Sequence, residues 1–499
     1  MAELIIVDFQ NISIFILLCL FSFLCYALFF KKPKGFDLPP SPPSLPIIGH
    51  LHHLLSSSLP HKSFQKLSFK YGPLLHLRIF NFPMVLVSSA SMAYEVFRTN
   101  DVNVSYRFVP VNKDSLVFGS SGFVTAPYGD YWKFMKKLIS TKLLRPHALE
   151  LSKGNRAEEL RRFCLDLQGK ARKKESVEIG KVALKLTNNI ICRMSMGRSC
   201  SEKNGVAERA RELVNKSFAL SVKLFFSNMF RKDIMGVSRE FDEFLERILV
   251  EHEENLEGDQ DRDMIDHLLE AYRNEEAEYK ITRKQIKSLI VEIFLGGTDS
   301  SAQTIQWTMA EILNNPGVLE KLRAEIDSVV GGKRLIQESD LPNLPYLQAV
   351  VKEGLRLHPS APVLLRVFGE SCEVKEFYVP EKTTLVVNLY AVNRDPDSWE
   401  DPDMFKPERF LVSSISGDEE KIREQAVKYV TFGGGRRTCP AVKLAHIFME
   451  TAIGAMVQCF DWRIKGEKVY MEEAVSGLSL KMAHPLKCTP VVRFDPFSF

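Results

Sequence analysis

The sequence has little of what a disulfide-bonded or nucleic-acid-binding protein needs. Its nine cysteines form no CxxC pair and no dense framework, which favours a reducing compartment over a disulfide scaffold. The formal net charge is only +4 over 499 residues, so no nucleic-acid partner is expected. The chain also has no internal repeat and only one proline-rich linker, which indicates one large domain over most of its length.

What the sequence does have begins with a long apolar run near the N-terminus. "NISIFILLCLFSFLCYALFF", residues 11–30, would form a helix about 30 Å long, the thickness of a bilayer core. Lys31, Lys32 and Lys34 follow this run and should remain on the cytosolic side. Residues 1–30 are therefore predicted to be an uncleaved signal anchor, with the rest of the chain in the cytosol.

A basic and proline-rich stretch, residues 31–50, follows the predicted anchor. Five prolines between Leu38 and His50 hold the backbone extended and remove hydrogen-bond donors, so neither helix nor sheet is expected there. This hinge is either a plain spacer or a stiff arm that sets how the domain at residues 51–499 sits on a membrane.

Hydrophobic periodicity predicts a mainly α-helical domain with small β-sheets. Residues 74–80, 83–89 and 383–392 have the composition of strands, whereas residues 130–360 mostly repeat apolar positions at three and four. The apolar segment 224–230 lies between charged helices, and it belongs either to the core or to a surface that touches the bilayer.

The longest predicted helix begins after Thr282, which can cap it, and ends at Asn315, before a proline. Its apolar centre is interrupted by "GGTDSS", residues 296–301, although glycine and buried aspartate both destabilise a helix interior. Either small residues let another helix cross here, or the helix widens beside a flat ligand and its polar groups handle protons.

Three further features are each weak evidence for a functional site when taken alone. Glu353 and Arg356 share a helix face at i, i+3, the spacing of a common exposed ion pair. Trp132 and Lys136 share another helix face, as a core tryptophan and a solvated lysine would. Arg409 lies in the proline-bounded loop "FKPERF".

A lone cysteine stands in "FGGGRRTCPAVKLA", residues 432–445, between a glycine-rich turn and an apolar stretch of helical character. Glycines permit the tight turn that presents backbone N–H groups, and such groups and nearby positive charge stabilise a thiolate. Cys439 is therefore either a buried core cysteine or a thiolate ligand.

Taken together and in this order, these segments resemble the cytochrome P-450 haem-thiolate monooxygenases over essentially the whole chain. The haem-binding signature F-x-x-G-x-R-x-C-x-G matches at Phe432, Gly435, Arg437 and Cys439. Ala441 replaces the last glycine, and its methyl group is expected to tighten packing against the haem.

The resemblance extends to the oxygen-activation motif, which residues 296–301 match. It implies catalytic roles for Asp299 and Ser300 in proton delivery. Ser300 stands where threonine is usual, so it keeps the hydroxyl but loses the rotamer restriction of a β-branched side chain. Looser coupling of oxygen use to product is expected.

The resemblance also implies the remaining site residues. The cofactor-binding residues are Trp132, Lys136, Arg366, Phe432, Gly435, Arg437 and Cys439, with Cys439 as the axial ligand of the haem iron. The structural cluster is Glu353, Arg356 and Arg409. The electron-donor face is expected to carry Lys133, Lys137, Lys142 and Lys443.

The substrate pocket that the resemblance implies lies between the long helix and the segments 105–123, 361–365 and 476–482. Its apolar side chains are exemplified by Val109, Val111, Phe118, Val363, Leu364 and Leu478. Such a lining suits a lipid-like substrate.

The chain looks most like the plant microsomal A-type enzymes, and among them like a crucifer family that includes thalianol-pathway triterpene oxidases. That likeness implies a single-pass protein of the endoplasmic reticulum membrane that uses haem b, O2 and electrons from NADPH through a separate reductase. The expected partners are this reductase, membrane lipid and a hydrophobic small molecule, with a triterpenoid-like substrate favoured and a phenylpropanoid or flavonoid second.

Two other functions stay open at this stage. One is a haem-thiolate isomerase or dehydratase that does not use O2, against which the Asp299 and Ser300 pair argues. The other is a non-catalytic haem-binding protein, against which the nearly complete set of motifs argues.

Overall fold

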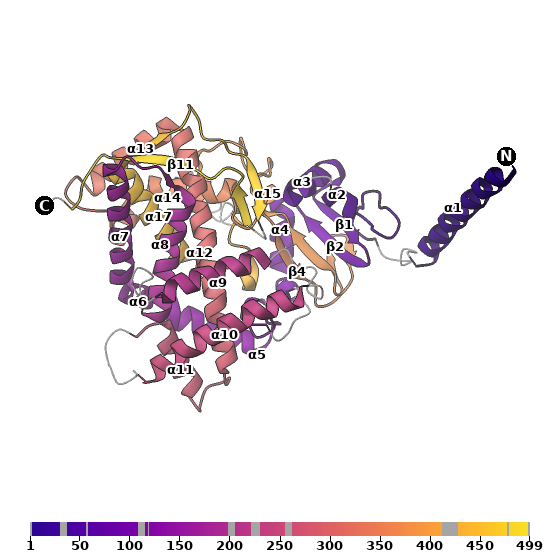
Figure 1. Ribbon diagram of the computed structural model, residues 1–499, viewed down its shortest axis with the longest axis horizontal. Helices are drawn as coiled ribbons and strands as arrows, with labels where there is room; N and C mark the ends of the chain where they lie inside the picture. The colour runs from indigo at the N-terminus through magenta and orange to yellow at the C-terminus, as the bar shows by residue number, and fades with distance from the viewer. Residues whose placement is uncertain are drawn as a thin grey trace.

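The computed structural model describes most of the chain. The described residues are 2–29, 37–55, 58–107, 115–117, 119–197, 205–220, 230–254, 262–411, 428–476 and 479–497. Within them, a large helical part lies beside a smaller part that contains the main β-sheet (Figure 1). The predicted fold class, mainly α with small sheets, is confirmed.

The helices have the following bounds: α1 Ala2–Phe29, α2 Leu51–Leu55, α3 Pro60–Tyr71, α4 Ala90–Thr99, α5 Asp130–Leu138, α6 Pro146–Leu151, α7 Lys153–Arg172, α8 Ile179–Met196, α9 Val206–Leu220, α10 Arg231–Glu254, α11 Met264–Arg273, α12 Arg283–Asn314, α13 Pro316–Val329, α14 Pro345–Leu357, α15 Leu389–Val392 and α17 Val442–Cys459. Shorter helical turns are η1 Asn103–Ser105, η2 Ile139–Leu143, η4 Glu338–Asn343, η5 Pro407–Phe410 and η7 Gly435–Arg437.

The strands form a four-stranded sheet in the order β1-β2-β7-β4 and three smaller sheets. Their bounds are β1 Leu74–Ile79, β2 Phe82–Val87, β3 Val177–Glu178, β4 Leu364–Val367, β5 Cys372–Val374, β6 Phe377–Val379, β7 Thr384–Val387, β8 Phe460–Ile464, β9 Glu473–Ser476, β10 Ser479–Met482 and β11 Lys487–Val492. Strand β2 pairs antiparallel with β1 and parallel with β7.

One predicted strand is wrong in its second half, which is helical. The composition of residues 383–392 predicts a strand throughout, but β7 ends at Val387 and helix α15 follows. The reason is Asn388, whose side chain accepts a hydrogen bond from the Ala391 N–H at 3.3 Å and so caps the new helix. The apolar composition of this segment fits a buried helix as well as a strand.

Helix α12 runs through the centre of the helical part, as the sequence predicts (Figure 1). Thr282 and Gln285 form a reciprocal capping box at its start. Helix α8 packs along it so closely that a Cβ on Gly297 would lie 2.8 Å from Ile191 Cδ1. A Cβ on Gly296 would meet nothing within 4 Å. The helix-crossing interpretation is therefore confirmed at Gly297, whereas Gly296 borders open space and its role beside a flat ligand stays a prediction.

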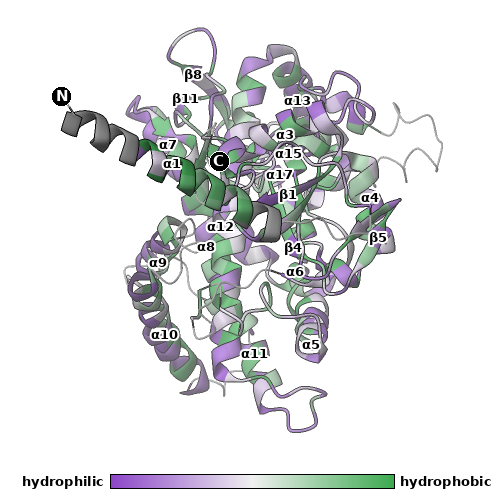
Figure 2. Ribbon diagram, turned by 90° about the vertical axis from the view of Figure 1, so that its right-hand side faces the viewer, coloured by the Kyte–Doolittle hydropathy of each residue, from purple (hydrophilic) through white to green (hydrophobic). Residues whose placement is uncertain are grey.

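Apolar packing divides into one large cluster in the helical part and two smaller clusters around the main sheet. Helix α10 shows why the surface helices are stable, since its inner face carries buried residues such as Phe241 and Leu245 and its outer face is hydrophilic (Figure 2). Phe230 packs against the large cluster. The rest of the 224–230 segment lies outside the described residues.

A search of the described residues finds no helix with the combined length and apolar character needed to cross a bilayer. The proposed boundaries of the anchor and hinge, residues 1–30 and 31–50, stay predictions.

Candidate functional site

Cys439 lies in a tight turn between η7 and α17. Its backbone N–H donates to the Phe432 carbonyl at 3.1 Å, which closes the turn. Gly433 and Gly435 have φ angles of +79° and +65°, where a side chain would be strained. A Cβ on Gly435 would also lie 2.1 Å from the Asp101 carboxylate. The glycine run is thus needed to bring the cysteine to this position.

The Cys439 thiol is subject to opposing influences. Burial raises its pKa, whereas the Ala441 N–H and the charges of Lys136 and Arg107 act to lower it. Ala441 itself has a φ of −95°, which any residue adopts, so the departure from the family's glycine costs no backbone strain. These groups offset part of the cost of a buried thiolate, so Cys439 is suited to bind a metal ion that displaces its proton.

Four cationic side chains gather around this turn, namely those of Arg107, Lys136, Arg366 and Arg437. Burial, and then the charges of Arg107 and Arg437, lower the pKa of Arg366 to about 9. Burial and Arg107 likewise lower the pKa of Arg437 to about 10. Buried like charges of this kind disfavour one another unless an anion lies among them.

Unpaired buried N–H groups show what that anion must offer. Arg366 is fully buried, and only its Nη2 has a partner, the Gly434 carbonyl at 2.7 Å. Arg366 Nε and Nη1, Arg107 Nε and Trp132 Nε1 are buried without a hydrogen-bond partner. Leaving a buried N–H group without a hydrogen-bond partner costs free energy of folding. Haem carries two propionates, and a thiolate is one of the ligands that its iron takes, so this set of residues fits a haem.

Trp132 and Lys136 do share a helix face, but the interpretation of Lys136 as a solvated lysine is wrong. Lys136 Nζ is half-buried and lies 3.4 Å from the Thr438 carbonyl, beside the Cys439 turn. Burial, opposed by Cys439 and assisted by Arg437, lowers the pKa of Lys136. The spacing indicated the shared face but gave no information about what lies opposite it.

Asp299 and Ser300 lie together on α12 next to the open side of Gly296. The Ser300 hydroxyl donates to the Gly296 carbonyl at 2.6 Å. Asp299 is buried, and its Oδ1 lies 3.2 Å from both Lys481 Nζ and Gln303 Nε2. Its Oδ2 is buried without a partner. The structure thus gives the predicted acid a counter-charge and leaves one carboxylate oxygen available to water or another hydroxyl.

The Glu353 cluster is buried rather than exposed. Arg356 Nε and Nη2 donate to the two Glu353 oxygens at 2.7 and 2.8 Å, and neither side chain is exposed. Arg409 Nε and the Lys406 N–H add bonds to Glu353 of 3.0 and 2.9 Å. The interpretation of Glu353 and Arg356 as a surface pair is therefore wrong, because the turn η5 covers them.

Arg107 and Lys481 belong to the site, and the sequence did not indicate either. Arg107 stands alone in a loop with no periodic partner, and Lys481 is 182 residues from the aspartate it contacts. Of the predicted pocket residues, Val363 and Leu364 are half-buried. Four others lie outside the described residues: Val109, Val111, Phe118 and Leu478.

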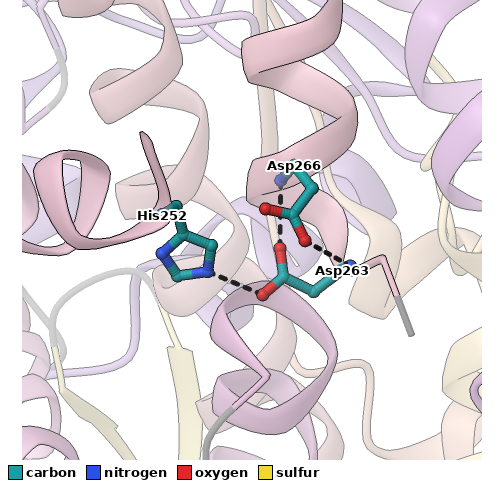
Figure 3. A group of neighbouring side chains, drawn as sticks. All are labelled: His252, Asp263 and Asp266. Atoms are coloured by element: carbon teal, nitrogen blue, oxygen red, sulfur yellow. Dashed lines mark hydrogen bonds and ion pairs between the residues drawn. The ribbon is translucent and has the colours of Figure 1, made fainter. Parts of the chain in front are cut away.

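A second group of possible metal ligands lies elsewhere. His252 of α10 and the residues Asp263 and Asp266 at the start of α11 bring ligand atoms close together (Figure 3). Asp263 and Asp266 form the capping box of α11, and His252 Nε2 lies 2.8 Å from Asp263 Oδ2. Burial acts to lower the pKa of His252, but Asp263 outweighs it and raises the pKa. The group is accounted for as a helix cap with an ion pair.

A lone thiol, buried cations with unpaired N–H groups and an acid–hydroxyl pair on a long helix are the features of a haem-thiolate protein. Residues 39–487 match the family model for cytochrome P450. The chain belongs to the cytochrome P450 family, whose members are in general haem-containing monooxygenases that use O2.

Relatives place the chain within that family. It is 61% identical to "Cytochrome P450 705A22" of Arabidopsis thaliana, over 100% of both chains, and 60% identical to "Cytochrome P450 705A5" over 99% of both. It is 39% identical to the "3,9-dihydroxypterocarpan 6A-monooxygenase" of Glycine max, over 97% of this chain and 98% of that one. A zebra fish cytochrome P450 solved with abiraterone matches 87% of this chain and 100% of its own, with a TM-score of 0.75 and 25% identity. The chain is a plant cytochrome P450 of the crucifer 705 family.

Proposed function

We propose that this protein inserts one oxygen atom from O2 into a hydrophobic plant specialised metabolite. The observation that carries this proposal is the Asp299 and Ser300 pair beside the open side of Gly296. A protein that only bound haem, or that rearranged a substrate without O2, would have no need of a buried acid with one unpaired oxygen at this point. A triterpenoid-like substrate is favoured, and a phenylpropanoid or flavonoid is second.

Haem b is the proposed cofactor, and the residues of this chain would bind and orient it. Cys439 would be the axial ligand, and Trp132, Arg366 and Arg437, together with Lys136 and Arg107, would hold the propionates. When bound, the haem supplies the iron that activates O2. The Ala441 N–H and the nearby cations would offset part of the burial that raises the pKa of Cys439, and the thiolate would bind the iron in place of its proton.

Proton handling on the substrate side would belong to α12. Lys481 holds the Asp299 carboxylate, whose second oxygen could take up a proton from a water molecule and pass it to a neighbouring hydroxyl. Ser300 would relay that proton, accepting it at Oγ while its own hydroxyl proton passes on toward the substrate side; the Ser300 side chain is half-buried and lies one turn from Gly296. Apolar side chains such as Val363 and Leu364 would exclude bulk water and bind the substrate.

Electrons would come from NADPH through a separate reductase. This part of the proposal rests on the exposed lysines around Trp132 and Cys439. Lys133 and Lys137 are 57% and 63% exposed, and Lys142 and Lys443 are exposed as well. A partner that presents acidic groups would dock faster on such a face, and salt would screen the attraction.

We also propose that residues 1–30 anchor the protein in the endoplasmic reticulum membrane, with residues 31–50 as the hinge and the catalytic domain cytosolic. The support is the length and apolar character of the 11–30 run and the lysines after it. In the described part of α1, side chains such as Phe15 and Phe21 are largely exposed apolar groups that lipid would cover.

Product analysis after co-expression with a plant reductase tests the proposal. The expected result is a product that carries one isotopically labelled oxygen from O2, formed from a member of a panel of triterpene and phenylpropanoid scaffolds. The Asp299→Asn variant, as a control, should bind the same scaffold but form little product. A rearranged product without labelled oxygen would show an isomerase, and haem binding without NADPH oxidation on any scaffold would show a non-catalytic protein.

A further inference from the structure

Glu292 lies on α12, one turn before Gly296, and the roles described so far do not use it. Its carboxylate oxygens accept from the Val124 N–H at 3.0 and 3.1 Å, and the N–H groups of Phe123 and Thr125 bond to it as well. Three successive backbone donors therefore converge on one side chain. A Cβ on Gly122 would lie only 2.1 Å from Glu292 Oε1, so the loop approaches the carboxylate as closely as a glycine allows.

Arg437 lies on the other side of the same loop and is hydrogen-bonded to it. Arg437 Nη1 donates to the Phe123 carbonyl at 3.3 Å, and Nη2 donates to the Ala126 carbonyl at 2.5 Å. Residues 122–126 thus lie between two groups, with their N–H side on Glu292 and two of their carbonyls on Arg437. Arg437 is one of the cations that fit the haem propionates.

We propose that Glu292 is a positioning residue that holds the loop 122–126 so that its carbonyls fix Arg437 for the haem, and that this hold weakens when Glu292 takes up a proton. The inference rests on the haem site of the family and not on the proposed substrate. Failure to find a substrate would therefore leave it unaffected.

The electrostatics give the hold a pH dependence. Burial raises the pKa of Glu292 to about 7, against the opposing effects of the three N–H groups and Arg107. Among the described residues, the titratable groups that face it are Arg107, Tyr131 of α5 and Arg437 of η7. Above that pH the ionised carboxylate accepts hydrogen bonds from all three N–H groups. Below it, one oxygen carries a proton that no N–H group can accept, so the hold is weaker.

Protonation of Glu292 weakens its bonds to the loop, but it should increase the free energy of unfolding of the whole protein. The pKa of Glu292 in the folded protein is above its ordinary value of 4.5. Keeping the carboxylate ionised therefore costs stability at high pH, and this cost is relieved as the pH falls from about 7 to about 4.5. A neutral replacement should loosen the haem at high pH without destabilising the fold. A residue that merely supports the fold would lower both together.

The test is the rate at which the haem-loaded full chain loses haem to an excess of apomyoglobin. Glu292→Gln should lose haem roughly tenfold faster than wild type at about pH 8, since bonds to a charged acceptor are lost. At about pH 5.5, where wild type is itself protonated, the two rates should converge. The melting temperature of Glu292→Gln at about pH 8 should equal or exceed that of wild type. Glu243→Gln, an exposed glutamate on α10, is the matched control and should change neither quantity.

Gly122→Ala provides an independent variant, because it displaces the carboxylate without removing its charge. It should also lose haem faster at about pH 8. The proposal is overturned if both variants retain haem as wild type does. It is also overturned if Glu292→Gln accelerates haem loss equally at both pH values, or if its melting temperature falls in parallel.

Discussion

Arg356 and Arg366 are only ten residues apart and both are fully buried, yet their surroundings are opposite. Every N–H of Arg356 is bonded, two to the Glu353 carboxylate and the others to the carbonyls of Asn393, Pro402 and Met404. Arg366 has one such bond, to Gly434. Glu353, Arg356 and Arg409 form a closed cluster, whose hydrogen bonds are complete within the fold. Arg366 belongs with Arg107, Lys136 and Arg437 to an open cluster, which has N–H groups left for a ligand.

The closed cluster should show the largest effect when it is broken. Arg356→Met leaves the Glu353 charge buried with fewer partners and removes the Arg356 bonds to three carbonyls, so the free energy of unfolding should fall by about 3–5 kcal/mol. Urea unfolding of the variant measures this. A loss below about 1 kcal/mol would mean that the pair behaves like an exposed one.

A second closed cluster, around Glu473, should make stability depend on pH. Glu473 at the start of β9 contacts His61 and Lys62 of α3 at 3.4 and 2.8 Å. Burial acts to raise its pKa, but these partners outweigh it and lower the pKa to about 2. The resulting stability, about 2–3 kcal/mol, is present above about pH 4.5 and is lost as the pH falls toward 2. Glu473→Gln should therefore be less stable than wild type at neutral pH and should approach it in acid, as urea titrations at several pH values would show. An equal difference at every pH would contradict this.

The open cluster should respond in a different way from the closed ones. Arg366→Met removes a buried charge that has one hydrogen bond, to Gly434, and a ring contact with Phe97. The fold should therefore lose less stability than with Arg356→Met, but haem affinity should fall by about 1–3 kcal/mol, or roughly tenfold to a hundredfold. Haem transfer to apomyoglobin and urea unfolding measure the two quantities separately. If Arg366→Met unfolds as readily as Arg356→Met, the distinction between open and closed clusters fails.

Lys481 gives the smallest of these effects, and it concerns chemistry rather than stability. Lys481→Met removes the cation that holds Asp299, so more of the reduced oxygen should be released as peroxide and less should appear in product. Substrate binding should be unchanged, and Lys481→Arg should restore much of the coupling. Lys487→Met, an exposed lysine of β11, is the control. Equal peroxide release by both methionine variants would remove Lys481 from the proton path.

The sequence predicted the local features well, because their causes are local. The cap at Thr282 defines the start of α12, and the glycine turn before Cys439 follows from positive φ angles. Burial of Glu353 was not predictable, since i, i+3 spacing is the same in an exposed pair and in a covered one. Lys481 was missed because its partner is far away in the chain and only the folded hairpin brings the two together.

The cationic cluster shows the same limit. Motif matches indicated Arg437 and Trp132, and the family resemblance implied Arg366, but none of them showed that N–H groups of Arg366 and Trp132 lack partners. Arg107 and Glu292 match no motif, and their roles depend on the loop that packs between α12 and the Cys439 turn. Unsatisfied hydrogen bonds are a property of the packed molecule, so the structure was needed to find them.

The central claim is that this open cluster and Cys439 together hold a haem with a thiolate ligand. The carbon-monoxide difference spectrum of the reduced protein tests it most directly, with Cys439→Ala compared with Cys459→Ala, a cysteine buried in the helical core. The account predicts that wild type and Cys459→Ala show the thiolate band and that Cys439→Ala has lost it. A thiolate band that survives in Cys439→Ala would contradict the account.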